Sequence, residues 1–281
     1  METQLANIPD AVRVYPASAG TVMLPLTPEN NYTATILFCG GSNVQPNRWT
    51  SPAFIVPTYA ASTSCVRLTP DQKSTYDRDE ALPEARTMAN FILLPDGRVL
   101  NINGAKFGTA GYGNNTWAIG HSYADDPVMA PRVYDPSKPE GSRWSDGGYK
   151  PSTIPRMYHS TALLLPDGSV MVSGSNPNPD FVESTPDVRY PTEYRTELFY
   201  PEYFNERRPE PKGLVSKLTY GGDGFDVNLS KEDLFGNIDN LKTAKVVIVR
   251  TGFSTHSMVS FAFSRRHPLT VLRTWASGLL S

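Results

Sequence analysis

The chain has 281 residues, of which 19% are charged, and it contains 21 glycines and 25 prolines. This length allows one large β domain or two ordinary domains, and the many turn-forming residues argue against long helices. With 26 basic and 28 acidic side chains the formal net charge is -2. The balance excludes the broad positive field that recruits nucleic acid or anionic lipid. Since no apolar stretch reaches about 18 residues, no membrane-spanning helix is predicted.

The cellular localisation is indicated only weakly, by the N-terminal sequence, the glycosylation sequons and the cysteine count. The first ten residues lack the basic and apolar regions of a signal peptide, which by itself indicates a cytosolic protein. Three Asn-x-Ser/Thr sequons, at Asn31, Asn114 and Asn228, and an even pair of cysteines instead favour a secreted protein. We therefore expect secretion, and we expect the natural N-terminus to lie upstream of Met1.

Short apolar or alternating runs bounded by Gly, Pro, Asn and Asp recur along the chain. Their period and flanking residues are typical of strands. They occupy residues 12–15, 36–38, 90–94, 99–102, 160–165, 170–172 and 246–249. No convincing amphipathic helix is present, so the predicted fold class is all-β.

Four of these runs belong to a repeat of two units. The segments FILLPDGRVL (91–100) and ALLLPDGSVM (162–171) each predict a strand, a Pro-Asp-Gly turn and a return strand. Gly97 and Gly168 place the period at 168 minus 97, or 71 residues. A weaker copy precedes them, with residues 33–41 as its return strand. Repeated strand pairs with a Gly after the second strand predict kelch-type β-propeller blades.

The composition changes after the last repeat. Residues 205–213, NERRPEPKG, form a charged, proline-rich linker. Beyond it we expect strands of an immunoglobulin-like β-sandwich at residues 215–220, 225–229 and 245–250. The remaining residues are too few for a complete sandwich, so only its beginning is expected. The predicted organisation is a partial propeller over residues 1–204, the start of the sandwich over 205–258 and a divergent tail over 259–281.

Two of the four histidines are candidates for chemistry. Tyr158 and His159 stand at the start of a predicted inner strand, where propeller loops converge on the axis, and His256 follows the strongest strand of the second domain. A lone histidine is more often structural than a ligand. Two imidazoles and a phenol oxygen would nevertheless suit tetragonal copper(II).

Longer motifs carry a family resemblance. The segments VRVYPAS (12–18), MLPLTP (23–28), PRMYHSTALLLPDG (155–168), YRTELFYP (194–201) and GFSTH (252–256) resemble the fungal glyoxal oxidases, which are copper radical oxidases related to galactose oxidase. The resemblance covers roughly residues 5–258. It implies a kelch propeller followed by an immunoglobulin-like domain, with one copper ion on the propeller axis.

The resemblance also implies roles for individual residues. Tyr158 corresponds to the axial tyrosine and catalytic base, His159 to the first equatorial histidine and His256 to the second, so all three are predicted copper ligands. The family oxidises small aldehydes such as glyoxal and methylglyoxal, or alcohols, with O2 and forms hydrogen peroxide. Its second electron acceptor is a tyrosyl radical on a ring that is cross-linked to a cysteine.

This chain departs from the family pattern at that radical pair. No residue matches the cross-linked tyrosine and cysteine, so we expect the chain to be incomplete and inactive alone. Cys39 and Cys65 lie in neighbouring predicted segments. A disulfide between them is favoured over a thioether to tyrosine.

The last residues depart from the family as well. Residues 259–281 contain no Asp or Glu and resemble no part of the family, and a shifted reading frame or retained intron is favoured over a membrane or partner segment. Two readings compete with an oxidase, namely a non-catalytic kelch module and a fragment without a stable fold. Expected partners are the substrate and O2, with no nucleic acid and no membrane, and the complete protein is expected to be a monomer.

Overall fold

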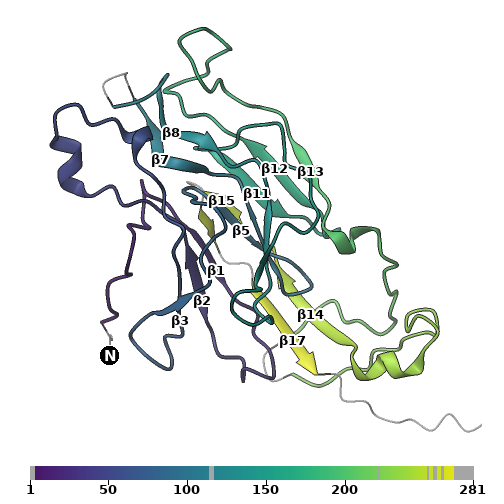
Figure 1. The fold of residues 1–281 in the computed structure, drawn as a ribbon. Helices are drawn as coiled ribbons and strands as arrows, with labels where there is room; N and C mark the ends of the chain where they lie inside the picture. Colours follow the sequence, from purple (N-terminus) through teal and green to yellow (C-terminus); the bar gives the residue numbers. More distant parts are fainter. Residues whose placement is uncertain are drawn as a thin grey trace, which may run out of the picture.

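The structure, a computed structural model, describes residues 4–113, 117–219, 222–251, 253–255, 258–260 and 263–268. Its regular elements are antiparallel strands and short 3-10 helices, which confirms the predicted all-β class (Figure 1). The helices are η1 (Pro46–Thr50), η2 (Val56–Thr58), η3 (Glu202–Asn205) and η4 (Ile238–Lys242).

Three antiparallel sheets follow one another along the chain. Sheet I pairs β1 (Gly20–Met23), β2 (Ile36–Cys39), β3 (Cys65–Leu68) and β4 (Asp77–Asp79) in sequence order. Sheet II pairs β5 (Asn90–Leu93), β6 (Val99–Ile102), β9 (Arg132–Tyr134) and β10 (Trp144–Ser145) in the same way. A hairpin of β7 (Ala105–Tyr112) and β8 (Ser122–Pro127) is inserted between β6 and β9. Sheet III contains β11 (Ser160–Leu164), β12 (Val170–Gly174) and β13 (Glu197–Phe199).

The predicted repeat is a repeat of local structure. Gly97 and Gly168 both take left-handed φ angles, 91° and 84°, in the turns that join β5 to β6 and β11 to β12. Asp96 and Asp167 each accept a hydrogen bond of 2.9 Å from the backbone N–H two residues further on. The two Pro-Asp-Gly turns therefore fold alike because the same side chain and the same glycine make the same contacts.

Sheet II lies between the other two and fills both interfaces from one strand. Successive residues of a strand face opposite ways, so Phe91 and Leu93 pack into the cluster shared with sheet I, while Ile92 and Leu94 pack into the cluster shared with sheet III. All four side chains are at most 2% exposed. Their burial stabilises the fold by about 1.5–3 kcal/mol each.

Close contact between sheets I and II requires a glycine in β1. A Cβ atom at Gly20 would lie 2.7 Å from two carbons of the Phe91 ring. The innermost strands β1 and β5 can lie side by side because this position has no side chain, and β5 in turn lies beside β11.

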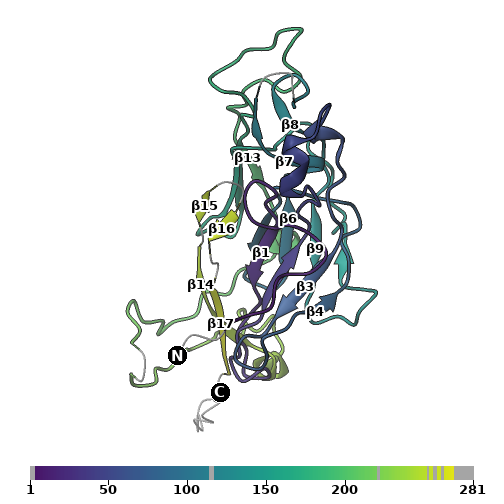
Figure 2. The same cartoon turned by 90° about the vertical axis from the view of Figure 1, so that its left-hand side faces the viewer.

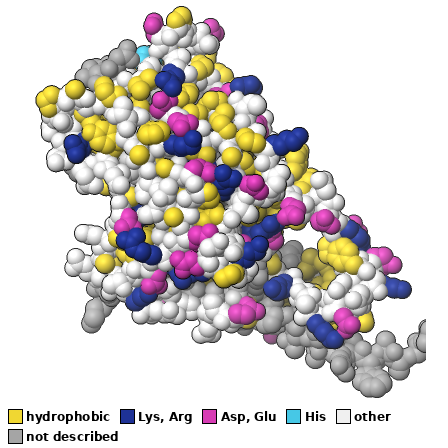
Figure 3. Space-filling model, in the orientation of Figure 1, with side chains coloured by type: hydrophobic (Ala, Val, Ile, Leu, Met, Phe, Trp, Pro, Cys, Tyr) yellow, Lys and Arg dark blue, Asp and Glu magenta, His cyan; other side chains and the backbone are white. Residues whose placement is uncertain are grey.

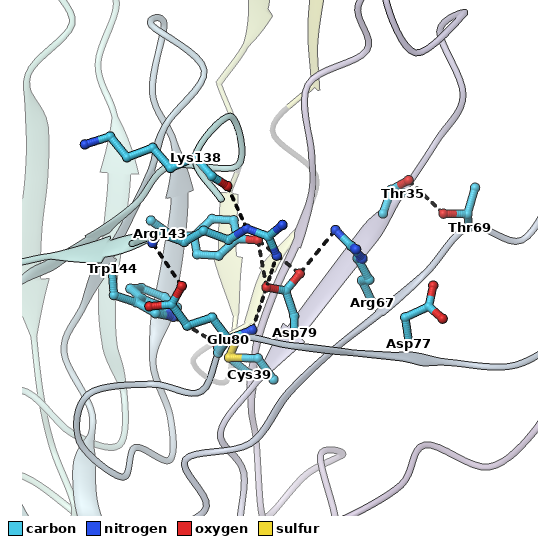
Figure 4. Close-up of polar contacts among 12 residues, drawn as sticks. Thr35, Cys39, Arg67, Thr69, Asp77, Asp79, Glu80, Lys138, Arg143 and Trp144 are labelled. Atoms are coloured by element: carbon cyan, nitrogen blue, oxygen red, sulfur yellow. Dashed lines mark hydrogen bonds and ion pairs between the residues drawn. A yellow bond between two sulfur atoms is a disulfide. The ribbon is translucent and has the colours of Figure 1, made fainter. Parts of the chain in front are cut away.

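Polar contacts join the outer strands of sheets I and II, as Figure 4 shows. The fully buried carboxylate of Asp79 in β4 accepts hydrogen bonds from Arg143 at 2.6 Å and from the Tyr134 hydroxyl at 3.1 Å. Trp144 donates its indole N–H to the Glu80 carbonyl oxygen at 3.0 Å. Burial and the neighbouring Asp79 carboxylate raise the pKa of Tyr134, which keeps its hydroxyl a donor. These contacts tie together segments that lie about 60 residues apart in sequence.

Cys39 and Cys65 lie directly opposite each other in strands β2 and β3. Their sulfur atoms form a disulfide, and no other cysteine occurs in the sequence. Because both sulfur atoms are used in this bond, neither is available for a thioether to tyrosine.

Three predicted strands are absent from the part of the chain that the structure describes. Residues 12–15 form no strand; within them Val12 makes an isolated bridge to Ser42, and Tyr15 and Pro16 lie in a turn. Residues 215–219 and 225–229 likewise form no strand; Asn228 makes one bridge, to Lys212. Several apolar side chains of these two segments, such as Leu218 and Phe225, are exposed, so no described sheet covers them.

The C-terminal strands lie against the three sheets. Strand β14 (Lys245–Arg250) pairs over six positions with β17 (Phe263–Pro268), which lies within the segment predicted to be a divergent tail. Between them, β15 (Phe253–Thr255) and β16 (Met258–Ser260) form a hairpin. Strand β15 lies against β11, and β16 against β1 and β5. Figure 2 shows this hairpin on one side of the molecule, with β14 and β17 below it.

The described surface carries charges of both signs. On the face in Figure 3, Lys and Arg side chains are interspersed with Asp and Glu. This mixing agrees with the small net charge of the sequence. Within the part of the chain that the structure describes, no helix is long and apolar enough to cross a membrane.

Candidate metal centre

A buried arginine recurs in front of the first strand of each sheet. Arg13, Arg86 and Arg156 are at most 6% exposed. Each donates to a backbone carbonyl at or next to the glycine that ends or follows the second strand of its sheet: Gly40 at 3.2 Å, Asn103 at 3.1 Å and Gly174 at 2.7 Å. Because a guanidinium group offers several donors in a fixed plane, each arginine holds the turn that enters its sheet.

Sequence analysis missed these arginines, although a signal was available. Arg86 and Arg156 are 156 minus 86, or 70, residues apart, close to the 71-residue period of the Pro-Asp-Gly turns. Each arginine is followed two residues later by a large side chain, which is Tyr15, Met88 and Tyr158 in turn. The repeated arginine therefore places these three side chains at equivalent points of the three sheets.

These equivalent positions converge in space. Met88 and Tyr158 belong to one buried cluster, together with Met157. The rings of Tyr15 and Tyr158 have centroids 6.4 Å apart, although 158 minus 15, or 143, residues separate them in sequence. Tyr158 therefore lies where the entrances to sheets I, II and III meet.

The inserted hairpin adds another aromatic ring to this site. Tyr112, at the end of β7, has its ring centroid 6.3 Å from that of Tyr158. The backbone N–H of Ala110 donates to the Pro16 carbonyl at 2.7 Å, which fixes β7 to the segment that carries Tyr15. Tyr158 is 5% exposed, whereas Tyr15 and Tyr112 are 52% and 38% exposed. The two exposed tyrosines thus flank a buried one.

The environment of Tyr158 favours its neutral form. Burial raises the pKa of the Tyr158 phenol, and a hydrogen bond with Tyr15 and the proximity of Tyr112 raise it further. At neutral pH the phenol therefore carries its proton in the metal-free chain. A phenol in this state can give up the proton when a cation binds its oxygen.

His159 is oriented by the loop that follows β12. Its Nδ1 atom lies 3.0 Å from the carbonyl oxygen of Asn176. A carbonyl oxygen can only accept, so Nδ1 carries the proton and the lone pair is on Nε2. The Asn176 N–H in turn donates to the Tyr158 carbonyl at 2.7 Å. This arrangement, in which a backbone carbonyl fixes the tautomer, is the usual one for metal-binding histidines.

The His159 backbone is left-handed, with φ of 63°, and Gly174 permits it. A Cβ atom at Gly174 would lie 2.6 Å from the His159 carbonyl oxygen. The rings of Tyr158 and His159 stack with centroids 3.8 Å apart. The two adjacent residues therefore present a phenol and an imidazole side by side, the former buried and the latter exposed.

The remaining predicted residues are placed as follows. His256 lies outside the described residues, between strands β15 and β16, so its role as second histidine ligand stays a prediction. His121, which is not one of the predicted ligands, has its Nδ1 3.3 Å from the Asn178 side-chain oxygen, and Asn178 donates to the Asn176 side chain at 3.0 Å. Among the residues that the structure describes, no three His, Cys, Asp or Glu side chains gather as in a metal site.

The donor set of the described site fits copper. Imidazole nitrogen combined with oxygen donors in a tetragonal arrangement suits Cu(II) or Ni(II). Tyr158 and His159 supply one donor of each kind, with the imidazole tautomer already set. One further imidazole would bring the set to the three ligands predicted from the sequence.

Known proteins share this fold and sequence. A fungal alcohol oxidase of the AA5 family, solved in complex with copper, superposes with a TM-score of 0.61 over 89% of this chain and 44% of its own, at 17% identity. An aldehyde oxidase, GLOX1, of Arabidopsis thaliana is 34% identical over 91% of this chain and 40% of its own length. An aldehyde oxidase, GLOX, of Vitis pseudoreticulata is 32% identical over 87% of this chain and 43% of its own. This chain thus spans about two fifths of either relative.

The fold resembles that of the matched part of this AA5-family alcohol oxidase. The family described as "Glyoxal oxidase N-terminus" matches residues 3–203, which include all three sheets and the Tyr158–His159 pair. The chain belongs to the glyoxal oxidase family, as the sequence motifs predict.

Proposed function

We propose that this chain forms part of the copper centre of an oxidase that converts small aldehydes to carboxylic acids. The observation that carries the proposal is the pair Tyr158 and His159, in which a buried phenol stacks on an imidazole whose Nδ1 is held by Asn176. Family membership supports the same assignment. His256 completes the proposed ligand set.

Copper held there would accept one electron at a time by passing between Cu(II) and Cu(I). The chain's own residues prepare this site. Burial and the hydrogen bond with Tyr15 raise the pKa of Tyr158, so its phenol is protonated at neutral pH. Tyr158 is the proposed base once that proton is lost. His159 directs Nε2 at the metal, while Tyr15 and Tyr112 border the exposed side, where a small substrate would enter.

We propose that sheets I, II and III are blades of a kelch propeller, with residues 205–258 beginning an immunoglobulin-like domain. Two features support this: inner strands β1, β5 and β11 lie side by side, and the β15–β16 hairpin lies against all three. A hairpin next to the inner strands would bring His256 toward the axis. The tail from residue 259 contributes β17, which pairs with β14.

The radical pair is proposed to lie outside these 281 residues. Both cysteines form the disulfide, so no cysteine here can be cross-linked to tyrosine. The relatives are more than twice as long as the matched segment, which leaves room for that pair in a longer, secreted protein. The chain alone is expected to bind copper without turnover.

The reaction proposed for the complete protein is balanced as an aldehyde hydrate plus O2 giving a carboxylic acid plus hydrogen peroxide. It is tested by loading the complete protein with copper and following O2 uptake and peroxide release with methylglyoxal. Equal amounts of O2 consumed and peroxide formed support an oxidase. A copper-loaded protein that consumes no O2 with any small aldehyde or alcohol contradicts it.

A further inference from the structure

The sequon at Asn31 lies in an exposed turn that the oxidase site does not use. Residues 24–35 connect β1 to β2, and Asn31 is exposed within them. Asn31 and Tyr32 both have left-handed φ angles, 50° and 54°. Asparagine tolerates this conformation better than most residues, so the turn can present an Asn side chain at its surface.

Two adjacent asparagines of this turn are used differently. The Asn30 side chain accepts from the Thr27 N–H and donates to the Pro25 carbonyl, both at 3.0 Å, so both ends of its amide are engaged in the turn. The Asn31 side chain makes no hydrogen bond with any residue that the structure describes. The amide that the Asn-Tyr-Thr sequon marks is thus the one that the fold leaves available.

The backbone of the turn is held without that amide. The N–H groups of Asn31, Tyr32 and Thr33 donate to carbonyl oxygens of residues 28, 27 and 30, at 2.9–3.0 Å. A bulky group on the Asn31 side chain would therefore displace no hydrogen bond of the turn. Surface turns of this kind are where sequons accept glycans in secreted proteins.

The turn is also remote from the copper site. Tyr15 precedes the start of β1, whereas the turn follows its end, after Met23. In Figure 1 the connection from β1 to β2 lies low in the view, and the β7–β8 hairpin that carries Tyr112 lies at the top. A glycan at Asn31 would leave the entrance beside Tyr15 and Tyr112 open.

We propose that Asn31 is an N-glycosylation site of this protein. The Asn31 Nδ2 atom attacks the sugar C1 of a lipid-diphosphate-linked oligosaccharide. A C–N bond forms, the C–O bond to the diphosphate breaks, the lipid diphosphate leaves, and the amide loses one proton to a base of the transferase. No electron transfer is involved. The proposal rests on the proposed secretion of the protein, because the transferase acts in the secretory pathway.

The other sequons make useful comparisons. Asn114 lies outside the described residues. Asn228 is exposed, but its sequon hydroxyl, Ser230 Oγ, accepts from the Asp233 N–H at 3.1 Å, and its own backbone pairs with Lys212. Single substitutions can determine separately whether each of the three sequons carries a glycan.

The test is translation of the full chain, behind a cleavable secretion leader, in the presence of endoplasmic reticulum microsomes. Protease protection shows that the chain has entered them. Protected chains are expected to carry a glycan that peptide N-glycosidase removes, leaving Asp at position 31 by mass spectrometry. Asn31→Gln and Thr33→Ala should each abolish the same shift in electrophoretic mobility, because both destroy the Asn31 sequon.

Asn30→Gln is the matched control, because it alters the neighbouring amide and leaves the sequon intact. It should keep the glycan at Asn31. Protected chains with unmodified Asn31 would overturn the proposal, whatever the copper site does. Loss of the Asn31 glycan in Asn30→Gln would also contradict it, since the sequon would then not define the site. Unchanged copper binding by Asn31→Gln separates this result from the oxidase assignment.

Discussion

The Nδ1 atom of His159 donates its proton to the carbonyl oxygen of Asn176, 3.0 Å away. This single contact decides which nitrogen of the ring can bind a metal, because it leaves the lone pair on Nε2. Asn176 also donates to the Tyr158 carbonyl, so one residue of the loop after β12 fixes both proposed ligands. The chemistry of the site therefore depends on a backbone contact that no side-chain motif reveals.

Replacing Arg156 by Lys should loosen the turn that carries Tyr158 and His159. Arg156 is 3% exposed and donates to the Gly174 carbonyl at 2.7 Å, the Arg195 carbonyl at 2.8 Å and Glu197 at 2.9 Å. A lysine ammonium cannot reach three separated acceptors. We expect a loss of about 1–3 kcal/mol in unfolding free energy, since two or more partly buried acceptors lose their donor.

The matched control for that change is Arg195→Lys. The Arg195 side chain is 68% exposed, and its backbone carbonyl stays in place for Arg156. Chemical denaturation should show little change for this variant, and copper binding should weaken in Arg156→Lys alone. Equal losses in the two variants would contradict the role given to Arg156.

Arg143→Ala should destabilise the chain far more than Arg78→Ala. The Asp79 carboxylate is fully buried and would lose its closest cation, at a cost of about 3 kcal/mol. Arg78 pairs with Asp10 on the surface and is 76% exposed, so its removal should cost less than about 1 kcal/mol. Urea denaturation of both variants measures the difference. Similar midpoints for the two would show that the Asp79 contacts do not join sheets I and II.

Glu84→Gln should destabilise the chain at neutral pH, with a difference that narrows in acid. Burial would raise the pKa of Glu84, but hydrogen bonds from Arg132 and Arg86 outweigh it and hold that pKa below its ordinary value of 4.5. The carboxylate's contribution to stability is therefore complete above pH 4.5 and is lost as the pH falls through the lowered folded-state pKa. Unfolding free energies measured between neutral and acid pH test this. If the difference in unfolding free energy between the wild type and Glu84→Gln widened in acid, the lowered pKa assigned to Glu84 would be contradicted.

Removing the disulfide by Cys39→Ser and Cys65→Ser together should cost about 3–4 kcal/mol, because it frees a loop between residues 26 apart. Wild-type chain unfolded under reducing conditions should show the same loss. Thermal or chemical unfolding of the oxidised, reduced and substituted chains makes the comparison. A double variant as stable as the oxidised chain would show that the bond does not constrain the unfolded state.

Local features of the fold were predictable from the sequence. The Pro-Asp-Gly turns carry their own glycine and their own aspartate, so Gly97 and Gly168 could be placed without knowledge of any distant residue. The strands at 36–38, 90–94 and 160–165 were predictable because each is a short apolar or alternating run between turn-forming residues. The strands expected at 215–220 and 225–229 do not form within the described residues, because apolar patterning does not reveal whether a partner sheet covers the segment.

Long-range features of the site were harder to predict. The approach of Tyr15 to Tyr158 depends on the packing of sheets I and III around sheet II, which no local pattern encodes. Tyr112 reaches the site because the β7–β8 hairpin folds back onto the segment after Tyr15. Tyr158 and His159 were identified through a family motif, and the buried arginines two residues before Tyr15, Met88 and Tyr158 would have revealed the convergence.

The most direct test of the copper centre is electron paramagnetic resonance of the chain titrated with Cu(II). We predict one site whose spectrum shows imidazole nitrogen coupling, and whose affinity falls at least about tenfold in His159→Ala, a difference of about 1.4 kcal/mol. His267→Ala, which alters a histidine in β17 opposite Val246, should leave spectrum and affinity unchanged. Circular dichroism confirms that each variant keeps its strands. A His159→Ala chain that binds copper with the wild-type spectrum and affinity would contradict the proposed centre.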